Sequence, residues 1–169
     1  MPKKNVKAIE SDRVRLRLLE ENDLDLTLSW RNQDGIRKWF FFQDKIEATN
    51  HRVWYEKYQA RDNDYVFIIE AKDLDWLPIG QVSIYNIDWE KSKGEYGRLM
   101  IGEKIAKGKG YAQDATSLIL KVASKVFELK EIYLEVYTQN QSARRVYEKC
   151  GFEVTESNPE VTKMSYYLA

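Results

Sequence analysis

The 169-residue chain contains one cysteine, Cys150, and three prolines. A single cysteine excludes an internal disulfide framework and a multi-cysteine zinc site, and it suits a reducing compartment. The formal net charge is zero, because 27 basic residues balance 27 acidic ones. The chain as a whole therefore has no positive charge that would attract nucleic acid or an anionic membrane. No apolar run approaches the roughly 18 residues of a spanning helix. We therefore expect a cytoplasmic protein with no nucleic-acid or membrane partner and no metal.

The composition that is present describes a globular chain rather than a disordered one. Hydrophobic residues make up 43% of the sequence, charged residues 32% and aromatic residues 13%. No repeat or linker divides the chain, so we predict a single domain over 1–169, with a flexible tail over the polar residues 1–10. The aromatic share exceeds the needs of a plain core, which indicates that some rings line a pocket.

Hydrophobic periodicity predicts an alternation of strands and helices. Period-two alternation or β-rich runs predict strands, and apolar spacings of three and four predict helices. The order is strand, helices, three strands, helix, strand, helix and two strands, which favours an α/β (α+β) fold with a mixed sheet and helices on both faces. The expected strands are 14–19, 65–71, 79–87, 95–102, 131–137, 152–156 and 161–169. The expected helices lie within 22–30, 31–42, 46–61, 111–128 and 140–150.

The stretch EKIAKGKGYAQDA, residues 103–115, places two glycines directly before the longest predicted helix. Five residues separate Gly102 from Gly108 and no Ser or Thr follows Lys109, so the stretch is not a Walker loop. Gln113 occupies the position of the third glycine of a dinucleotide fingerprint, which excludes that motif too. A glycine turn that opens a helix remains able to bind an anion through free N–H groups. The alternative is a solvated connection between strand and helix.

A second stretch, NQSARRVYEKCGF at residues 140–152, follows the next strand. Asn140 can cap the helix or bind a ligand amide, and Tyr147 lies two turns further on, as a packing residue or with its hydroxyl near the same strand. Together the two stretches resemble the GNAT superfamily of acetyl-CoA-dependent N-acetyltransferases. That resemblance implies a mostly antiparallel, twisted sheet of about seven strands, splayed between the fourth and fifth. One departure is Ile105, where the family usually has Gln or Arg.

The resemblance also implies where acetyl-CoA binds. Backbone groups of Met100 and Ile101 would pair with the pantetheine arm, which Asn140 and Ala143 would contact. Arg144 or Arg145 would reach the nucleotide phosphates. The pyrophosphate would be held by the main chain of Lys107, Gly108, Lys109, Gly110, Tyr111 and Ala112.

Amide formation from a thioester needs a proton donor for the thiolate, an oxyanion donor and a base for the amine. The resemblance places Tyr147 near the thioester sulfur, and a phenol is protonated at neutral pH. A main-chain N–H of residues 99–102 is the expected oxyanion donor. We favour Glu95 as the base, acting directly or through a water molecule. The alternative is that Glu95 is a surface carboxylate of the strand. His51, the only histidine, is the rival base or a residue of a helix start.

The acceptor is predicted from the N-terminal third. The stretches WRNQDGIRKWFFF, NHRVWYEKY and GQVSIYNIDWEKSKGEYG resemble the GNAT branch that acetylates nucleotide-linked 4-amino sugars, as in the pseudaminic acid pathway. The expected partner is therefore a small-molecule amine, bound by a monomer or homodimer. Alternatives are acetylation of a ribosomal-protein N terminus, or acetyl-CoA binding without catalysis. Candidate groups are Arg31 and Arg37 for a diphosphate, Trp39, Trp54 and Tyr85 for stacking, and Asn32 and Asn86 for hydroxyls.

Overall fold

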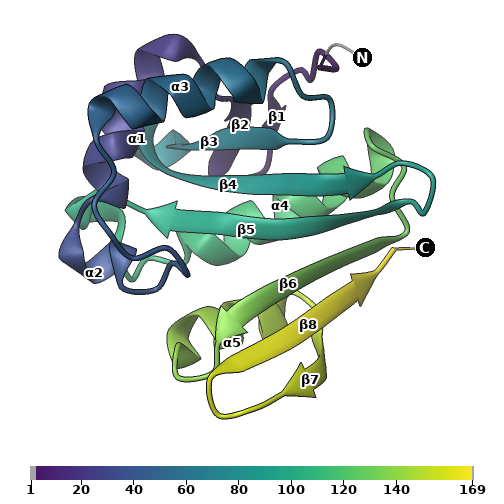
Figure 1. The fold of residues 1–169 in the computed structure, drawn as a ribbon. Helices are drawn as coiled ribbons and strands as arrows, with labels where there is room; N and C mark the ends of the chain where they lie inside the picture. The colour runs from purple at the N-terminus through teal and green to yellow at the C-terminus, as the bar shows by residue number, and fades with distance from the viewer. Residues whose placement is uncertain (1–2, 169) are drawn as a thin grey trace.

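The computed structural model describes residues 3–168, and a single eight-stranded sheet runs through it (Figure 1). The strand order is β1-β2-β3-β4-β5-β6-β8-β7, and every neighbouring pair is antiparallel except β5 and β6. The predicted mixed, mostly antiparallel sheet is therefore confirmed. The strands are β1 Ile9–Glu10, β2 Val14–Leu18, β3 Tyr65–Ala71, β4 Leu77–Asp88, β5 Lys93–Ile101, β6 Glu131–Tyr137, β7 Glu153–Ser157 and β8 Val161–Tyr167.

The strand beyond the seven expected ones is β1, which lies inside the stretch predicted to be a flexible tail. Ile9 pairs with Leu16 of β2, and Val6 is buried in the main core. The Lys3 ammonium donates hydrogen bonds to the backbone carbonyls of Arg61 and Asp64. The tail prediction is thus corrected for residues 3–10, because apolar side chains and backbone pairing hold them on the sheet. Residues 1 and 2 lie outside the described residues.

Helices cover both faces of the sheet, as predicted. Alternate residues of β3 show the two layers, because Val66 and Ile68 pack with the Leu24 and Tyr58 side chains of α1 and α3, whereas Phe67 belongs to the core under α4. Figure 1 shows α3 and α1 on one side of the sheet and α4 behind it. The helices are α1 Leu24–Arg31, α2 Asp34–Arg37, α3 Ala48–Gln59, α4 Tyr111–Lys125 and α5 Gln141–Lys149, with short 3-10 turns η1 Glu21–Asp23, η2 Lys72–Leu74 and η3 Lys104–Ala106.

The sheet opens between β5 and β6, the fourth and fifth of the expected strands. These two parallel strands are paired only where Lys93, Gly94 and Glu95 face Glu131, Ile132 and Tyr133. Beyond that point β5 continues beside β4, whereas β6 continues beside β8, so the two strands diverge (Figure 1). The predicted splay is confirmed, and it leaves a wedge-shaped gap at the carboxyl ends of both strands.

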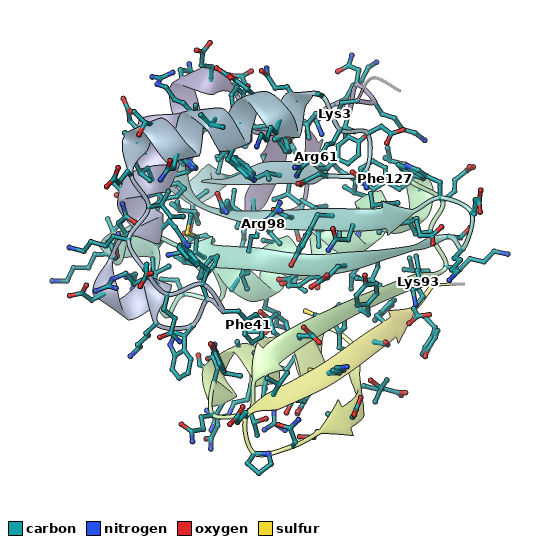
Figure 2. The ribbon with its side chains drawn as sticks, in the orientation of Figure 1. Lys3, Phe41, Arg61, Lys93, Arg98 and Phe127 are labelled. Atoms are coloured by element: carbon teal, nitrogen blue, oxygen red, sulfur yellow. The ribbon has the colours of Figure 1, made fainter. Side chains whose placement is uncertain are left out.

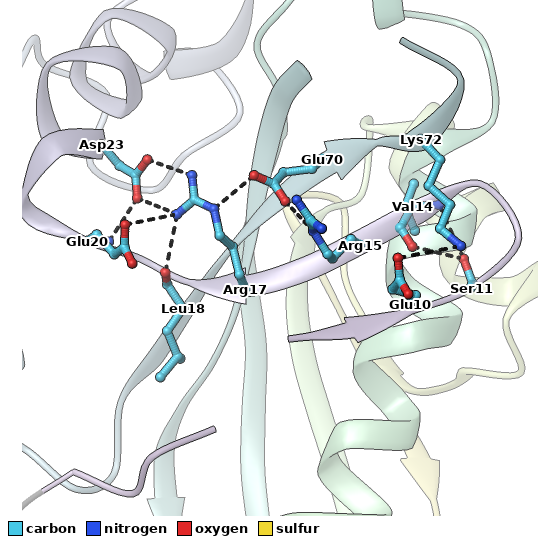
Figure 3. Close-up of polar contacts among 10 residues, drawn as sticks. All are labelled: Glu10, Ser11, Val14, Arg15, Arg17, Leu18, Glu20, Asp23, Glu70 and Lys72. Carbon is cyan, nitrogen blue, oxygen red and sulfur yellow. Dashed lines mark hydrogen bonds and ion pairs between the residues drawn. The ribbon is translucent and has the colours of Figure 1, made fainter. Parts of the chain in front are cut away.

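Away from this gap, charged side chains of β2, β3 and η1 form ion pairs with one another. Arg15 and Arg17 of β2 point to the same face, and their Nε atoms donate to Glu70 Oε1 and Oε2 at 2.6 and 2.9 Å (Figure 3). Arg17 also binds both carboxylate oxygens of Asp23. Buried Glu70 is thereby neutralised, as a carboxylate removed from water must be. Within residues 3–168, no helix combines the length and apolarity that a membrane crossing requires.

Candidate active site

A cavity of about 410 Å³ occupies the gap between β5 and β6. Its walls come from β4, β5, β6, the start of α4, the inner face of α5, and the segment that follows α2. Sites for small ligands are typically concave, mostly apolar and supplied with a few polar groups, and this cavity has those properties. Ten of the residues predicted from the sequence line it: Trp39, Tyr85, Glu95, Met100, Ile101, Lys107, Ala112, Asn140, Ala143 and Tyr147.

One wall of the cavity is an unpaired strand edge. Because β6 leaves β5 after Glu95, the edge of β5 from Tyr96 to Ile101 has no strand partner on that side among the described residues. Backbone donors and acceptors on such an edge can pair with an extended ligand that carries amides, as an added strand would. Met100 and Ile101 line the cavity on this edge. The geometry therefore leaves a free backbone edge along one wall of the cavity.

The glycine turn meets this edge at the start of α4. Gly108 and Gly110 have φ values of +72° and +85°, in the left-handed region that favours glycine, and Gly110 is the N-cap residue of α4. A Cβ on Gly108 would have no neighbour within 4 Å, so the turn is open on that side. The first amides of α4 have no partner within the helix, which makes this end suitable for a phosphate.

An arginine that the sequence reading missed holds the turn from outside. Arg13 Nη2 donates to the Lys109 carbonyl at 2.9 Å, and Arg13 Nη1 pairs with Asp114 Oδ2 of α4 at 2.8 Å. Its guanidinium also lies 4.4 Å from the ring centroid of Tyr111, whose hydroxyl donates to Asp73. The side chain of Tyr111 is thus engaged in the core, and only its backbone remains at the turn. In the sequence, Arg13 is a single arginine before a strand and belongs to no recognisable motif, so it could not be predicted to contact the turn.

The end of β5 is fixed by α1. A Cβ on Gly102 would lie 2.0 Å from Cγ of Trp30, so the indole packs directly on this glycine. Trp30 Nε1 donates to Glu103 Oε2 at 2.6 Å, and Gln33 Nε2 donates to the Gly102 carbonyl at 2.9 Å. Lys107, which lines the cavity, also donates to Gln33 Oε1. The approach to the glycine turn is therefore positioned by residues of the N-terminal third.

The opposite wall is α5, which begins after Asn140. Asn140 Oδ1 accepts a hydrogen bond from the Ala143 amide at 3.3 Å, so the side chain caps the helix. Tyr147 lies two turns further on, against the ring of Tyr96 at 5.3 Å between centroids. Burial raises the pKa of Tyr147, so its hydroxyl stays protonated at neutral pH and can donate a proton.

Arg144 is placed differently from the expected phosphate ligand. Its Nη1 donates to the Thr138 carbonyl at 3.1 Å, and its Nη2 lies 4.0 Å from Glu148. The side chain does not line the cavity. Within the described residues its guanidinium therefore braces the β6–α5 connection instead of pointing at the turn.

The two candidate bases lie in different surroundings. Glu95 lines the cavity and accepts hydrogen bonds from the Tyr85 hydroxyl and the Asn86 amide, each at 3.0 Å. His51 lies on α3, where its Nε2 is 3.1 Å from Thr27 Oγ1 and its ring stacks on Trp54 at 5.5 Å. Burial lowers the pKa of His51, and neither His51 nor Trp54 lines the cavity. The geometry brings Glu95, not His51, to the site.

The polar residues predicted to bind the acceptor are engaged within the protein. Arg31 donates to the Phe42 carbonyl, and Arg37 donates to the Gln43 carbonyl at 3.0 Å and to Asp34. Asn32 exchanges two hydrogen bonds with the backbone of Ile46, both at 2.8 Å. These side chains close the segment of residues 38–47 into a loop. None of the three lines the cavity.

The loop of residues 38–47 instead brings aromatic rings to the cavity. Trp39 is 39% exposed and lines it, together with Phe40 and Phe41. The Phe41 ring lies 4.7 Å from that of Tyr137 at the end of β6, so the loop reaches across the gap between the two halves of the sheet (Figure 2). On this side the cavity is therefore lined by aromatic rings and not by Arg31 or Arg37, the two arginines predicted to bind the acceptor.

Comparison with known proteins gives a family and several relatives. A family model described as the acetyltransferase (GNAT) domain matches residues 13–153. A spermidine N(1)-acetyltransferase of Vibrio cholerae is 26% identical over 142 residues, which cover 84% of this chain and 80% of the relative. The uncharacterized protein MJ1062 of Methanocaldococcus jannaschii is 26% identical over 153 residues, 89% of this chain. This chain spans only 30% of that relative's length.

Solved structures have the same fold. The spermidine N-acetyltransferase of Vibrio cholerae in complex with CoA and spermine has a TM-score of 0.83 at 24% identity, covering 93% of this chain and 96% of that one. FdhC, described as a nucleotide-linked sugar GNAT, has a TM-score of 0.80 at 24% identity, covering 98% of this chain and 90% of that one. At this identity the likeness shows the fold alone.

Proposed function

This chain belongs to the GNAT acetyltransferase family and is an acyltransferase, and from that premise we propose that it transfers acetyl from acetyl-CoA to a nucleotide-linked amino sugar. The observation that carries the reaction is the meeting of four features in one cavity. These are the unpaired edge of β5, the open glycine turn, the protonated Tyr147 and the carboxylate of Glu95. Acetyl-CoA enters as a cosubstrate, and no step requires a metal ion.

Acetyl-CoA would lie along the free edge of β5. Its pantetheine amides pair with the backbone at Met100 and Ile101, and its pyrophosphate binds the amides around Gly108 and Gly110. Asn140 and Ala143 face the arm from the opposite wall. In this pose the thioester lies between β5 and Tyr147, and a main-chain N–H of β5 serves as the oxyanion donor.

Transfer then follows direct attack in a ternary complex. The neutral amine attacks the thioester carbonyl carbon and forms the C–N bond, while charge develops on the carbonyl oxygen. Collapse breaks the C–S bond, and the leaving thiolate takes the hydroxyl proton of Tyr147. The amine proton passes to Glu95, directly or through one water. Glu95 then releases this proton to solvent and Tyr147 takes one up from solvent, which completes the cycle. The products are the acetamide and free CoA.

Three observations support a nucleotide-linked acceptor. Trp39 offers a partly exposed ring at the cavity mouth, on which a base or sugar can stack. Lys38 lies next to it, with its ammonium 5.3 Å from the Trp39 ring centroid, and could meet a phosphate. FdhC, whose structure matches 98% of this chain, is described as a nucleotide-linked sugar GNAT.

A polyamine is the second candidate. Two carboxylates, Glu95 and Glu135, line the cavity and could bind a cationic chain. The relative from Vibrio cholerae that is 26% identical is described as a spermidine acetyltransferase. A small-molecule amine is common to both candidates, and a monomer or homodimer remains our expectation for the assembly.

Release of free CoA thiol from acetyl-CoA, measured with a panel of amines, separates these candidates. We expect the highest kcat/KM with a nucleotide-linked 4-amino sugar, and none with the matched sugar that carries a hydroxyl in place of the amine. Faster turnover of spermidine would favour the polyamine, and turnover of a peptide N terminus would favour a protein acceptor. If none of the amines in the panel supported thiol release, the proposal of acetyl transfer itself would be overturned.

A further inference from the structure

Two irregularities interrupt the pairing of β4 with β5, one on each side of the Tyr85–Glu95 pair. The register shifts between Gln81 and Ser83, and again between Tyr85 and Asp88. At each bulge a residue other than glycine has a positive φ, +49° at Asn86 and +54° at Arg98. Such a backbone costs about 1–3 kcal/mol per residue and persists only where its surroundings determine it. Bulges of this kind re-aim side chains beside functional sites.

The two bulges bring extra side chains onto the face of Glu95. Regular alternation would place Asn86 opposite to Tyr85, and Arg98 opposite to Glu95 and Gly97. Instead, Asn86 Nδ2 donates to Glu95 Oε1 at 3.0 Å, and the Arg98 guanidinium lies 4.1 Å from the ring centroid of Tyr85. Tyr85, Asn86, Glu95 and Arg98 are therefore brought together from two strands, and all of them except Asn86 line the cavity.

Both oxygens of Glu95 have a fixed donor. Asn86 serves Oε1, and the Tyr85 hydroxyl serves Oε2 at 3.0 Å. Burial raises the pKa of Tyr85, so its hydroxyl keeps the proton that it donates. A carboxylate oxygen can accept more than one hydrogen bond, so Glu95 can still bind an amine or a water from the cavity.

The Tyr85 ring is itself held from two sides. A Cβ on Gly97 would lie 2.8 Å from the Tyr85 hydroxyl, so this glycine leaves the space that the ring occupies. On the other side, Arg98 binds both carboxylate oxygens of Asp64, at 2.7 and 3.2 Å, and Asp64 is only 3% exposed. A bidentate pair with a buried carboxylate fixes the plane of the guanidinium.

We propose that Arg98, anchored by Asp64, is a positioning residue that acts through Tyr85 to orient the Glu95 carboxylate toward the acceptor amine. This inference rests on the proposed function, in which Glu95 receives the amine proton. Tyr85 of β4 and Tyr133 of β6 lie within electrostatic reach of Glu95, and Arg98 of β5 and Glu135 of β6 line the same cavity. Among them, Arg98 alone is tied to a buried counter-charge outside the cavity.

A double-mutant cycle tests this chain of contacts. Arg98→Lys keeps the charge but loses the bidentate pair, and we expect kcat/KM for the acceptor to fall about tenfold, with the KM for acetyl-CoA unchanged. Tyr85→Phe should give a similar loss, because the carboxylate loses the hydroxyl donor that orients it. If Arg98 acts through Tyr85, the double variant should be no worse than Tyr85→Phe.

Arg15→Lys is the matched control. Arg15 also pairs with a buried carboxylate, that of Glu70 (Figure 3). Its guanidinium lies 4.0 Å from the ring centroid of Trp76, but Arg15 does not line the cavity. Additive losses in the cycle, or equal losses for Arg15→Lys and Arg98→Lys, would overturn the positioning role.

A second readout does not depend on turnover. In protein labelled with ¹³C on glutamate, the Glu95 carboxyl signal should be displaced by Arg98→Lys and by Tyr85→Phe, and unmoved by Arg15→Lys. An unmoved signal in all three variants would also overturn the role. A wild-type protein that acetylates no amine, with the signal displaced as expected, would reject the proposed function while supporting the arrangement of side chains.

Discussion

The two sides of the cavity are built from different materials. The side formed by β5, the glycine turn and α5 relies on main-chain groups, and residues expected there line the cavity, Met100 and Ala143 among them. The other side is formed by α2 and the loop of residues 38–47, and it was expected to act through the charged and amide side chains of residues 31, 32 and 37. Arg31 and Asn32 are instead bound to that loop's own backbone. The spacing of glycines predicts the geometry of a backbone turn, whereas no sequence pattern predicts which partner a charged side chain will bind.

The strongest way to break this comparison is to fill the glycine turn. Gly110→Trp places an indole at a residue with φ +85°, and should weaken acetyl-CoA binding about 100-fold or more, equivalent to about 3 kcal/mol, through the loss of two phosphate hydrogen bonds. Isothermal titration calorimetry measures the affinity. Lys121→Trp is the control, because Lys121 is exposed on the same helix, more than two turns beyond the glycine turn. If Gly110→Trp bound acetyl-CoA with wild-type affinity, the pyrophosphate site could not be at the glycine turn.

A smaller effect is expected at Tyr147, a reactive side chain on the side built from main-chain groups. Tyr147→Phe should lower kcat about 100-fold and leave the KM for acetyl-CoA nearly unchanged, because only the proton for the thiolate is lost. Steady-state kinetics at saturating acceptor measure this. Tyr166→Phe removes a hydroxyl from the same aromatic cluster, where its ring lies 5.7 Å from that of Phe152, and should turn over normally. Equal rates in the two variants would remove Tyr147 from the proton transfer.

The smallest effect is expected in α3, which lies outside both sides of the cavity. His51→Gln should keep kcat/KM within about twofold, because His51 does not line the cavity. Burial lowers the pKa of His51 from its ordinary 6.5, so the unfolded chain binds the proton more readily. Wild-type stability should therefore fall as the pH drops below about 6.5, and His51→Gln should lose that part of the dependence. Urea unfolding between pH 5 and pH 8 measures it, and a large loss of activity would restore His51 as the base.

Much of the architecture could be predicted from the sequence because it depends on periodicity. The all-buried run of β3, the amphipathic α4 and the glycines with positive φ each have a compositional signature. The strand β1 had none, since two paired residues in a polar stretch are indistinguishable from a tail.

The interior of the site could be predicted only in part. Tyr85 and Asn86 were expected to contact the acceptor, and they hydrogen bond to Glu95. The reason is that a bulge at a residue other than glycine has no sequence signal, and it moves a side chain to the other face of the strand. Arg98 was missed for the same reason, because its guanidinium reaches the cavity only through its unusual φ.

The contact between Trp30 and Gly102 limits how this enzyme can be recombined with its relatives. The indole occupies the place of the missing Cβ, so the two positions are sterically interlocked although 72 residues apart in sequence. A chimaera that takes its first 60 residues from another family member inherits that member's residue 30 against this chain's Gly102. A smaller residue leaves a void beside the entrance to the turn, and Gly102 cannot gain a side chain while the indole stays. A graft of the N-terminal third that is meant to change the acceptor therefore has to transfer the residues at positions 30 and 102 together.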